Sequence, residues 1–207
     1  MARLDRLYNP LWSLWVFISA LEWSVTGSDS KTPSEKHVDL GKEYLARGNF
    51  QDALEEFHRA IDGDPENFMT YYRRATVYLA LGKAKAALSD LNKVIELKPD
   101  FTAARIQRGN VFLKQGNLEA ARSDFEAVLR VNPSLEEARI QMESLHGIGR
   151  KKEDALMAFE DHEYPLTIDL VSDLLENHCS WDVSLRELRG QAHLAMGDMP
   201  QAISDFK

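Results

Sequence analysis

The sequence has a single cysteine, Cys179, so no disulfide within the chain can stabilise the fold. It also lacks an asparagine glycosylation triplet, because the one near match, residues 132–134, has proline in the middle position. No apolar run reaches the roughly 20 residues that a membrane-spanning helix needs. The longest, residues 11–21, is interrupted by two serines. These absences exclude a disulfide-stabilised scaffold and argue against a membrane-spanning helix.

Basic residues are fewer than acidic ones: the sequence has 25 Lys and Arg and 33 Asp and Glu, which gives a net charge of −8. A protein that neutralises nucleic-acid phosphates needs a surplus of Lys and Arg. The one basic cluster, residues 149–152, is followed at once by Glu153 and Asp154. We therefore expect no nucleic-acid partner. With 44% hydrophobic residues the composition also excludes a disordered or collagen-like chain.

Enzyme motifs are missing as well. The sequence has no Gly-x-Ser-x-Gly, no P-loop, no His-Glu-x-x-His and no Cys-x-x-Cys. Asp161, His162, His178 and Cys179 are the only residues that suggest a metal site, but His178 and Cys179 are adjacent and would face different sides of a helix. We expect no catalytic residue, no metal, no cofactor and no enzymatic activity.

The N-terminal segment, residues 1–27, is typical of a secretory signal peptide. Two arginines precede the apolar run 11–21, and Val25 and Gly27 suit the −3 and −1 positions of a cleavage site. An uncleaved membrane anchor and a buried N-terminal helix are the alternatives. The preferred interpretation predicts entry into the secretory pathway, with no membrane insertion after cleavage.

The most informative feature is self-similarity at an offset of 34 residues, which is typical of repeat architectures. Counted from Ser34 as place 1, seven places of the repeat keep the same kind of residue three times. They are place 8 (Gly41, Ala75, Gly109), place 11 (Tyr44, Tyr78, Phe112), place 15 (Gly48, Gly82, Gly116), place 20 (Ala53, Ala87, Ala121), place 24 (Phe57, Leu91, Phe125), place 27 (Ala60, Val94, Val128) and place 32 (Pro65, Pro99, Pro133).

These places predict a pair of antiparallel helices in each repeat. Small residues at places 8 and 20 allow the two helices to approach closely, and the bulky residues at places 11 and 24 fill the space beside them. Glycine at place 15 ends the first helix, and proline at place 32 stops the second. The sequence therefore predicts an all-α solenoid with repeats at 34–67, 68–101 and 102–135.

Beyond Leu135 the register slips. A spacer at 136–147, helical at first, restores it, and a degenerate repeat then fits 148–181, with Ala155 at place 8 and Cys179 in place of the proline. A truncated repeat occupies 183–207, since the sequence stops within its second helix.

The pattern Leu40-Gly41-x-x-Tyr44, Ala53-x-x-x-Phe57 and Pro65 resembles the tetratricopeptide repeat family, whose fold is a superhelix of helix pairs. The segments 71–76 (YYRRAT) and 100–105 (DFTAAR) carry a narrower likeness. They resemble the N-terminal part of the ER-lumenal co-chaperones that join tetratricopeptide repeats to a DnaJ domain, a family also known as inhibitors of the interferon-induced protein kinase.

That resemblance implies a role in the unfolded protein response. In the family, the first repeats bind unfolded polypeptide and a C-terminal J domain stimulates the chaperone ATPase BiP. The sequence has no His-Pro-Asp triplet, so a BiP-type partner is expected only for a longer form that carries a J domain. The resemblance implies holding of clients without ATPase stimulation.

For the binding surface we take places 2, 5, 9 and 12 of the first helices, which face away from the partner helix. Their apolar members predict a client-binding groove formed by Val38, Leu45, Met69, Tyr72, Leu79, Ile106 and Leu113. The alternative is that this stripe belongs to the core. Adaptors that grip acidic chaperone tails use a clamp of Lys, Asn and Arg, and the matching residues here are Val38, Lys42, Arg73, Ala103 and Gln107. The clamp is missing.

The sequence thus predicts a non-enzymatic module that binds unfolded or misfolded clients in the ER lumen. The alternative function is that of an adaptor or inhibitor that binds a specific folded partner, such as a protein kinase.

Overall fold

The computed structural model describes residues 31–207, and the predicted signal peptide, residues 1–27, lies outside them. The described part consists of helices without strands, which confirms the all-α prediction. The helices are α2 (Pro33–Ala46), α3 (Phe50–Gly63), α4 (Phe68–Ala80), α5 (Ala84–Leu97), α6 (Thr102–Lys114), α7 (Leu118–Val131), α8 (Glu136–Glu160), α9 (Tyr164–Asn177), α10 (Val183–Ala195) and α11 (Met199–Asp205).

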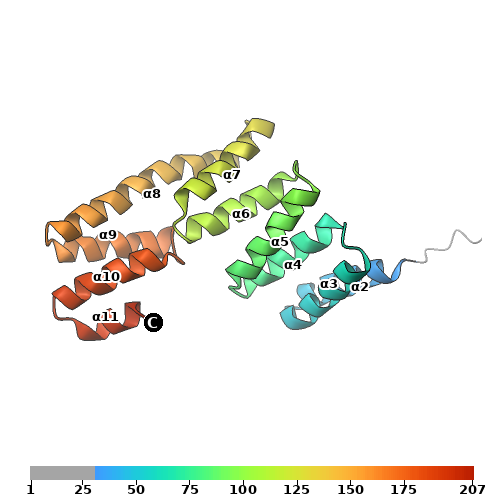
Figure 1. The fold of residues 1–207 in the computed structure, drawn as a ribbon, viewed down its shortest axis with the longest axis horizontal. Coiled ribbons are helices and arrows are strands. Elements are labelled where there is room, and N and C mark those ends of the chain that lie inside the picture. The colour runs from blue at the N-terminus through green and yellow to red at the C-terminus, as the bar shows by residue number, and fades with distance from the viewer. Residues whose placement is uncertain (1–30) are drawn as a thin grey trace, which may run out of the picture.

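Consecutive helices form five antiparallel pairs, from α2/α3 to α10/α11, and each pair stacks on the next. The result is an elongated, curved row in which the chain runs from α2 at one end to α11 at the other (Figure 1). Each pair touches little beyond its neighbours, as expected for a solenoid. We refer below to the even-numbered helices as first helices and to the odd-numbered ones as second helices.

The turns within the pairs explain the glycine at place 15. Gly48, Gly82 and Gly116 have φ of 76°, 68° and 74°, a left-handed conformation that costs glycine nothing. In the fourth pair the same place holds His162, which adopts φ of 64°. An L side chain is strained in that conformation.

Helix α8 is longer than any other helix of the described residues, with 25 residues. It contains the predicted spacer, which is therefore no separate segment but the first half of a helix. Ala138 and Leu145 in this half are 0% and 1% exposed, and Ala138 packs on Val128 of α7. The second half packs on α9 through Ala155. Twelve extra residues rotate the helix surface by about 120°, so one helix covers the third pair and also completes the fourth.

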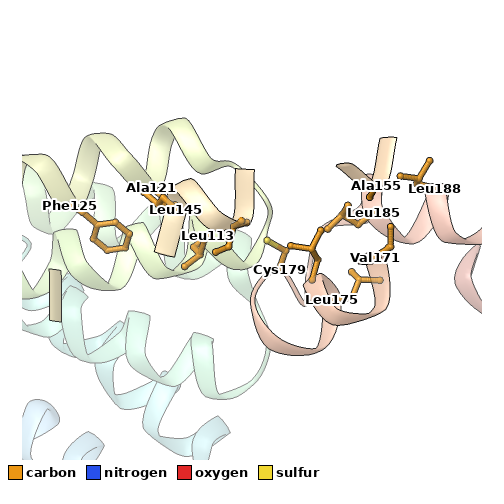
Figure 2. Packing of buried hydrophobic residues seen from close by; sticks show 12 residues of the cluster. Leu113, Ala121, Phe125, Leu145, Ala155, Val171, Leu175, Cys179, Leu185 and Leu188 are labelled. Carbon is orange, nitrogen blue, oxygen red and sulfur yellow. The ribbon is translucent and has the colours of Figure 1, made fainter. Parts of the chain in front are cut away.

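The largest cluster of buried side chains among the described residues joins the third, fourth and fifth pairs. Figure 2 shows Cys179 between the side chains from α6 and α7 and those from α9 and α10. Cys179 is fully buried, and burial raises the pKa of its thiol to about 11. The thiol is therefore protonated at neutral pH and serves as a small apolar side chain in this core.

Candidate concave binding surface

In α4 and α6 one face, formed by places 3 and 10, is buried against the preceding pair. Val77 of α4 packs on Phe57 of α3, and Ala104 of α6 packs on Leu91 of α5. The four side chains at these places in α4 and α6 are at most 2% exposed: Thr70, Val77, Ala104 and Val111. This face of α4 and α6 is therefore closed to ligands.

A second face, formed by places 5 and 12, meets the following pair. In the third repeat, Ile106 packs with Val128 and Ala138, and Leu113 belongs to the cluster that contains Leu145. Both Ile106 and Leu113 are only 8% exposed. The expectation that these two side chains line an open groove is therefore wrong, because the first half of α8 covers them.

The other five predicted groove residues, Val38, Leu45, Met69, Tyr72 and Leu79, are partly buried. Leu45 packs beside Phe57 and Val77, and the ring of Tyr72 meets that of Phe101 edge to face, with centroids 5.0 Å apart. Burial and the nearby Glu137 carboxylate raise the pKa of Tyr72. We call these five side chains the apolar seam, and each of them retains some access to solvent.

Between the two buried faces lies a third face, which we call the free arc. At 3.6 residues per turn it consists of places 2, 6, 9 and 13. Its centre is rotated by about 50° around the helix axis from the predicted stripe at places 2, 5, 9 and 12. None of its residues in the first three repeats is buried: Glu35, Asp39, Lys42, Ala46, Met69, Arg73, Thr76, Ala80, Ala103, Gln107, Asn110 and Lys114. The candidate binding surface is therefore a polar arc beside an apolar seam.

On α2 the free arc carries an ion network. Asp39 accepts hydrogen bonds from Lys31 at 2.6 Å and Lys42 at 2.8 Å, and these bonds lower the pKa of Asp39 to about 2. Together with Glu35, Val38 and Asn67 these residues line a hollow of about 300 Å³. Since the charged groups are exposed, they contribute little to stability, but they set the charge that a ligand meets at this end.

Ion pairs between place 7 of the first helix and place 23 of the second helix were not predicted from the sequence. Arg74 binds Asp90 through two hydrogen bonds of 2.8 and 2.7 Å, and Arg108 binds Asp124 at the same distances. Arg189 and Asp205 repeat the arrangement in the fifth pair. The sequence signal is an Arg and an Asp 16 residues apart in the second, third and fifth repeats, whereas the first repeat has Leu40 and Glu56 at these places. These bidentate pairs connect the two helices of a pair and leave the free arc unobstructed.

A clasp joins the third pair to the loop between α9 and α10. Asp182 accepts a hydrogen bond from Lys152 of α8 at 2.7 Å and also caps the start of α10. The backbone N–H of Trp181 donates to the carbonyl of Lys114 at 2.8 Å. Burial raises the pKa of Asp182, but the hydrogen bonds from Lys152 and Ser184 outweigh it and hold the pKa below its usual value. The clasp thus connects Lys114 of α6, Lys152 of α8 and the loop before α10.

Two absences concern the described residues alone. Within residues 31–207, no group of three or more His, Cys, Asp and Glu side chains is placed to hold a metal ion. In the same range, no helix combines the length and the apolar character needed to cross a bilayer.

Stacked helix pairs with glycine turns define a tetratricopeptide-repeat solenoid, a class of non-enzymatic binding scaffolds. Two tetratricopeptide repeat models match residues 38–100 and 78–142, and the chain belongs to this family. It is 51% identical over 176 residues to DnaJ homolog subfamily C member 3 of Rattus norvegicus, a match that covers 84% of the chain and 35% of the relative. The relative of Bos taurus is 52% identical over the same length. The chain thus spans about a third of the length of these relatives.

Among solved structures, the crystal structure of the P58(IPK) TPR domain is similar, with 50% identity and a TM-score of 0.74. The match covers 84% of this chain and 49% of that one. The first TPR of Spaghetti (RPAP3), bound to an HSP90 peptide, is 28% identical with a TM-score of 0.52, over 55% of this chain and 90% of that one. Of the clamp positions compared above, only Lys42 carries a suitable amine here, and it is paired with Asp39.

Proposed function

We propose that this chain is the client-holding part of a co-chaperone, which binds extended segments of unfolded or misfolded proteins in the ER lumen. The observation that carries the proposal is the 51% identity to DnaJ homolog subfamily C member 3 over 84% of the chain. The apolar seam supports it, since Val38, Met69 and Leu79 can each bury part of a client side chain beside the polar free arc.

The expected affinity is low. Burial of three or four client side chains contributes about 1.5–3 kcal/mol each, and the cost of ordering a flexible peptide removes much of that gain. The remainder corresponds to a dissociation constant on the order of micromolar. Such weak binding suits a client that must be released again. Stimulation of a BiP-type ATPase would belong to a longer form with a J domain.

The test is competition between two unrelated denatured proteins, reduced carboxymethylated lactalbumin and denatured rhodanese, for the purified chain. A shared site for unfolded segments predicts mutual competition and no binding of folded lactalbumin. The double variant Val38→Gln/Met69→Gln should bind both proteins at least tenfold more weakly. The matched control is Val131→Gln, which changes an apolar side chain that is 64% exposed on the second helix α7.

Absence of binding to both denatured proteins would overturn the proposal. Binding to a folded protein kinase domain alone would instead establish the adaptor or inhibitor function. Placement in the ER lumen has its own test: translation in the presence of microsomes should yield a protected product that lacks residues 1–27.

A further inference from the structure

The middle of α8 contains two glycines that the packing of the chain does not require. Gly147 and Gly149 lie on either side of Ile148 in this helix of 25 residues. A Cβ atom added to Gly147 would meet nothing within 4 Å outside its own helix. One added to Gly149 would meet only Leu118 Cδ1, at an ordinary contact distance of 3.8 Å. Neither glycine has a positive φ, so alanine would fit at both positions.

Glycines in the middle of other helices have a packing reason that these two lack. Gly41, Gly109 and Gly190 each face a phenylalanine ring, and an added Cβ atom would approach that ring to 2.6–2.7 Å. These three glycines allow the two helices of a pair to approach closely. Glycine otherwise lowers the stability of a helix relative to alanine, because the unfolded chain is more flexible. At Gly147 and Gly149 this loss of helix stability brings no gain in packing.

The two glycines lie at the boundary between two parts of the chain. The half of α8 before them covers the third pair through Ala138 and Leu145, and the half after them packs on α9 through Ala155. Closely spaced small residues are among the few causes of a sharp bend within a helix. A bend at this point would leave the packing within each part intact.

Outside α8, the clasp and an apolar cluster connect the two parts. The ammonium of Lys152, which follows the glycines, donates to the carbonyl of Gly116 at 3.3 Å. The ammonium of Lys114 lies 5.0 Å from the centre of the Trp181 ring. The apolar side chains around Cys179 fill the joint between the parts (Figure 2). The Lys152 side chain is 22% exposed, so water can replace its partners more easily than it can enter the apolar cluster.

We infer that Gly147 and Gly149 form a hinge in α8, at which the last two pairs move as one body relative to the first three. The clasp holds the hinge in the conformation shown in Figure 1. A hinge absorbs the change in backbone angles at a few residues, while the bodies on both sides keep their packing. The inference goes beyond client binding, because the hinge sets the angle between the two parts of the row for any ligand.

Distances between pairs of spin labels test the hinge. Labels at Glu126→Cys in α7 and Gln201→Cys in α11 occupy exposed positions on the two sides of it. Labels at Gln51→Cys in α3 and Glu126→Cys form a control pair within the first body. Every protein in the comparison, including the reference, carries Cys179→Ala, so that only the introduced thiols react.

We expect Gly147→Ala/Gly149→Ala to narrow the distance distribution across the hinge by about a factor of two, because alanine stiffens the helix. Lys152→Met opens the clasp and should widen it. The matched control is His146→Ala, which introduces alanine at the neighbouring exposed position of α8 without removing a glycine and should leave the width unchanged. The control pair should keep its distribution in all variants.

An unchanged or wider distribution in the double alanine variant would overturn the hinge. Equal narrowing by His146→Ala would overturn it as well, because the effect would then not depend on the glycines. An unchanged width in the Lys152→Met variant would overturn the role of the clasp.

Discussion

The ring of Phe125 occupies the space that a side chain at Gly109 would fill. A Cβ atom added to Gly109 would lie 2.7 Å from Phe125 Cε1, and the same relationship links Gly41 to Phe57 and Gly190 to Phe206. Where place 24 is the smaller Leu91, place 8 is alanine. The two places therefore vary together, so that the space between the two helices of each pair stays filled.

This pairing predicts a compensated double variant. Gly109→Ala should destabilise the chain by about 1–2 kcal/mol, since overpacking outweighs the gain in helix propensity. Phe125→Leu alone should also destabilise it, through a cavity. Combined, they reproduce the Ala75/Leu91 pair of the second repeat, so their costs should not add. Urea unfolding of the single and double variants measures the coupling, and strict additivity would contradict the prediction.

The Arg108–Asp124 pair should contribute to stability, because Asp124 is only 2% exposed and accepts two hydrogen bonds from the Arg108 guanidinium. Asp124→Asn weakens both hydrogen bonds and should cost about 1–3 kcal/mol in urea unfolding. The control is Glu119→Gln, which removes an exposed carboxylate 3.8 Å from Arg122 and should leave the midpoint unchanged. Equal changes in the urea midpoint for the two variants would show that the buried ion pair contributes no more to stability than the exposed one.

The clasp predicts a pH dependence. The pKa of Asp182 is lowered in the folded chain, so its contribution to stability is complete above the unfolded pKa of about 3.9 and is lost as the pH falls through the folded value. Lys152→Met removes the ion pair and should make the unfolding free energy less dependent on pH below about 4. Parallel urea titrations between pH 5 and 3 would measure this, and identical slopes would count against the clasp.

The reactivity of the Cys179 thiol measures local opening of the loop between α9 and α10, which also contains Asp182. This thiol is buried, and burial raises its pKa to about 11, so iodoacetamide at pH 8 should modify it far more slowly in the folded chain than in urea. Asp182→Ala removes the cap of α10 and the partner of Lys152, and should accelerate the folded-state reaction by on the order of tenfold through local opening. An unchanged rate would show that the loop is held by its apolar contacts alone.

His162 provides a stability prediction at the fourth turn. It adopts the left-handed conformation that glycine takes in the other four pairs. His162→Gly should raise stability by about 0.5–1 kcal/mol, since the relief of strain exceeds the greater flexibility of unfolded glycine and the loss of the hydrogen bond to Tyr164. Thermal unfolding would check the sign, and Gly197→Ala in the next pair should act in the opposite direction.

Much of the architecture follows from residue order alone. The 34-residue period, the turns at Gly48 and Gly82 and the helix ends before Pro65 and Pro99 all depend on local conformational preferences. The sequence also contained the 16-residue spacing of Arg74 and Asp90, although only the structure showed that the two side chains meet.

The all-α repeat is encoded locally, because helix propensity, turn residues and the packing of small against large residues act within some 34 positions. Which side of a first helix remains open was decided by tertiary structure. The apolar period predicted that Ile106 and Leu113 face a groove, but the first half of α8 lies across them. A helical period identifies the faces of a helix, whereas the direction of its neighbours decides which face they cover.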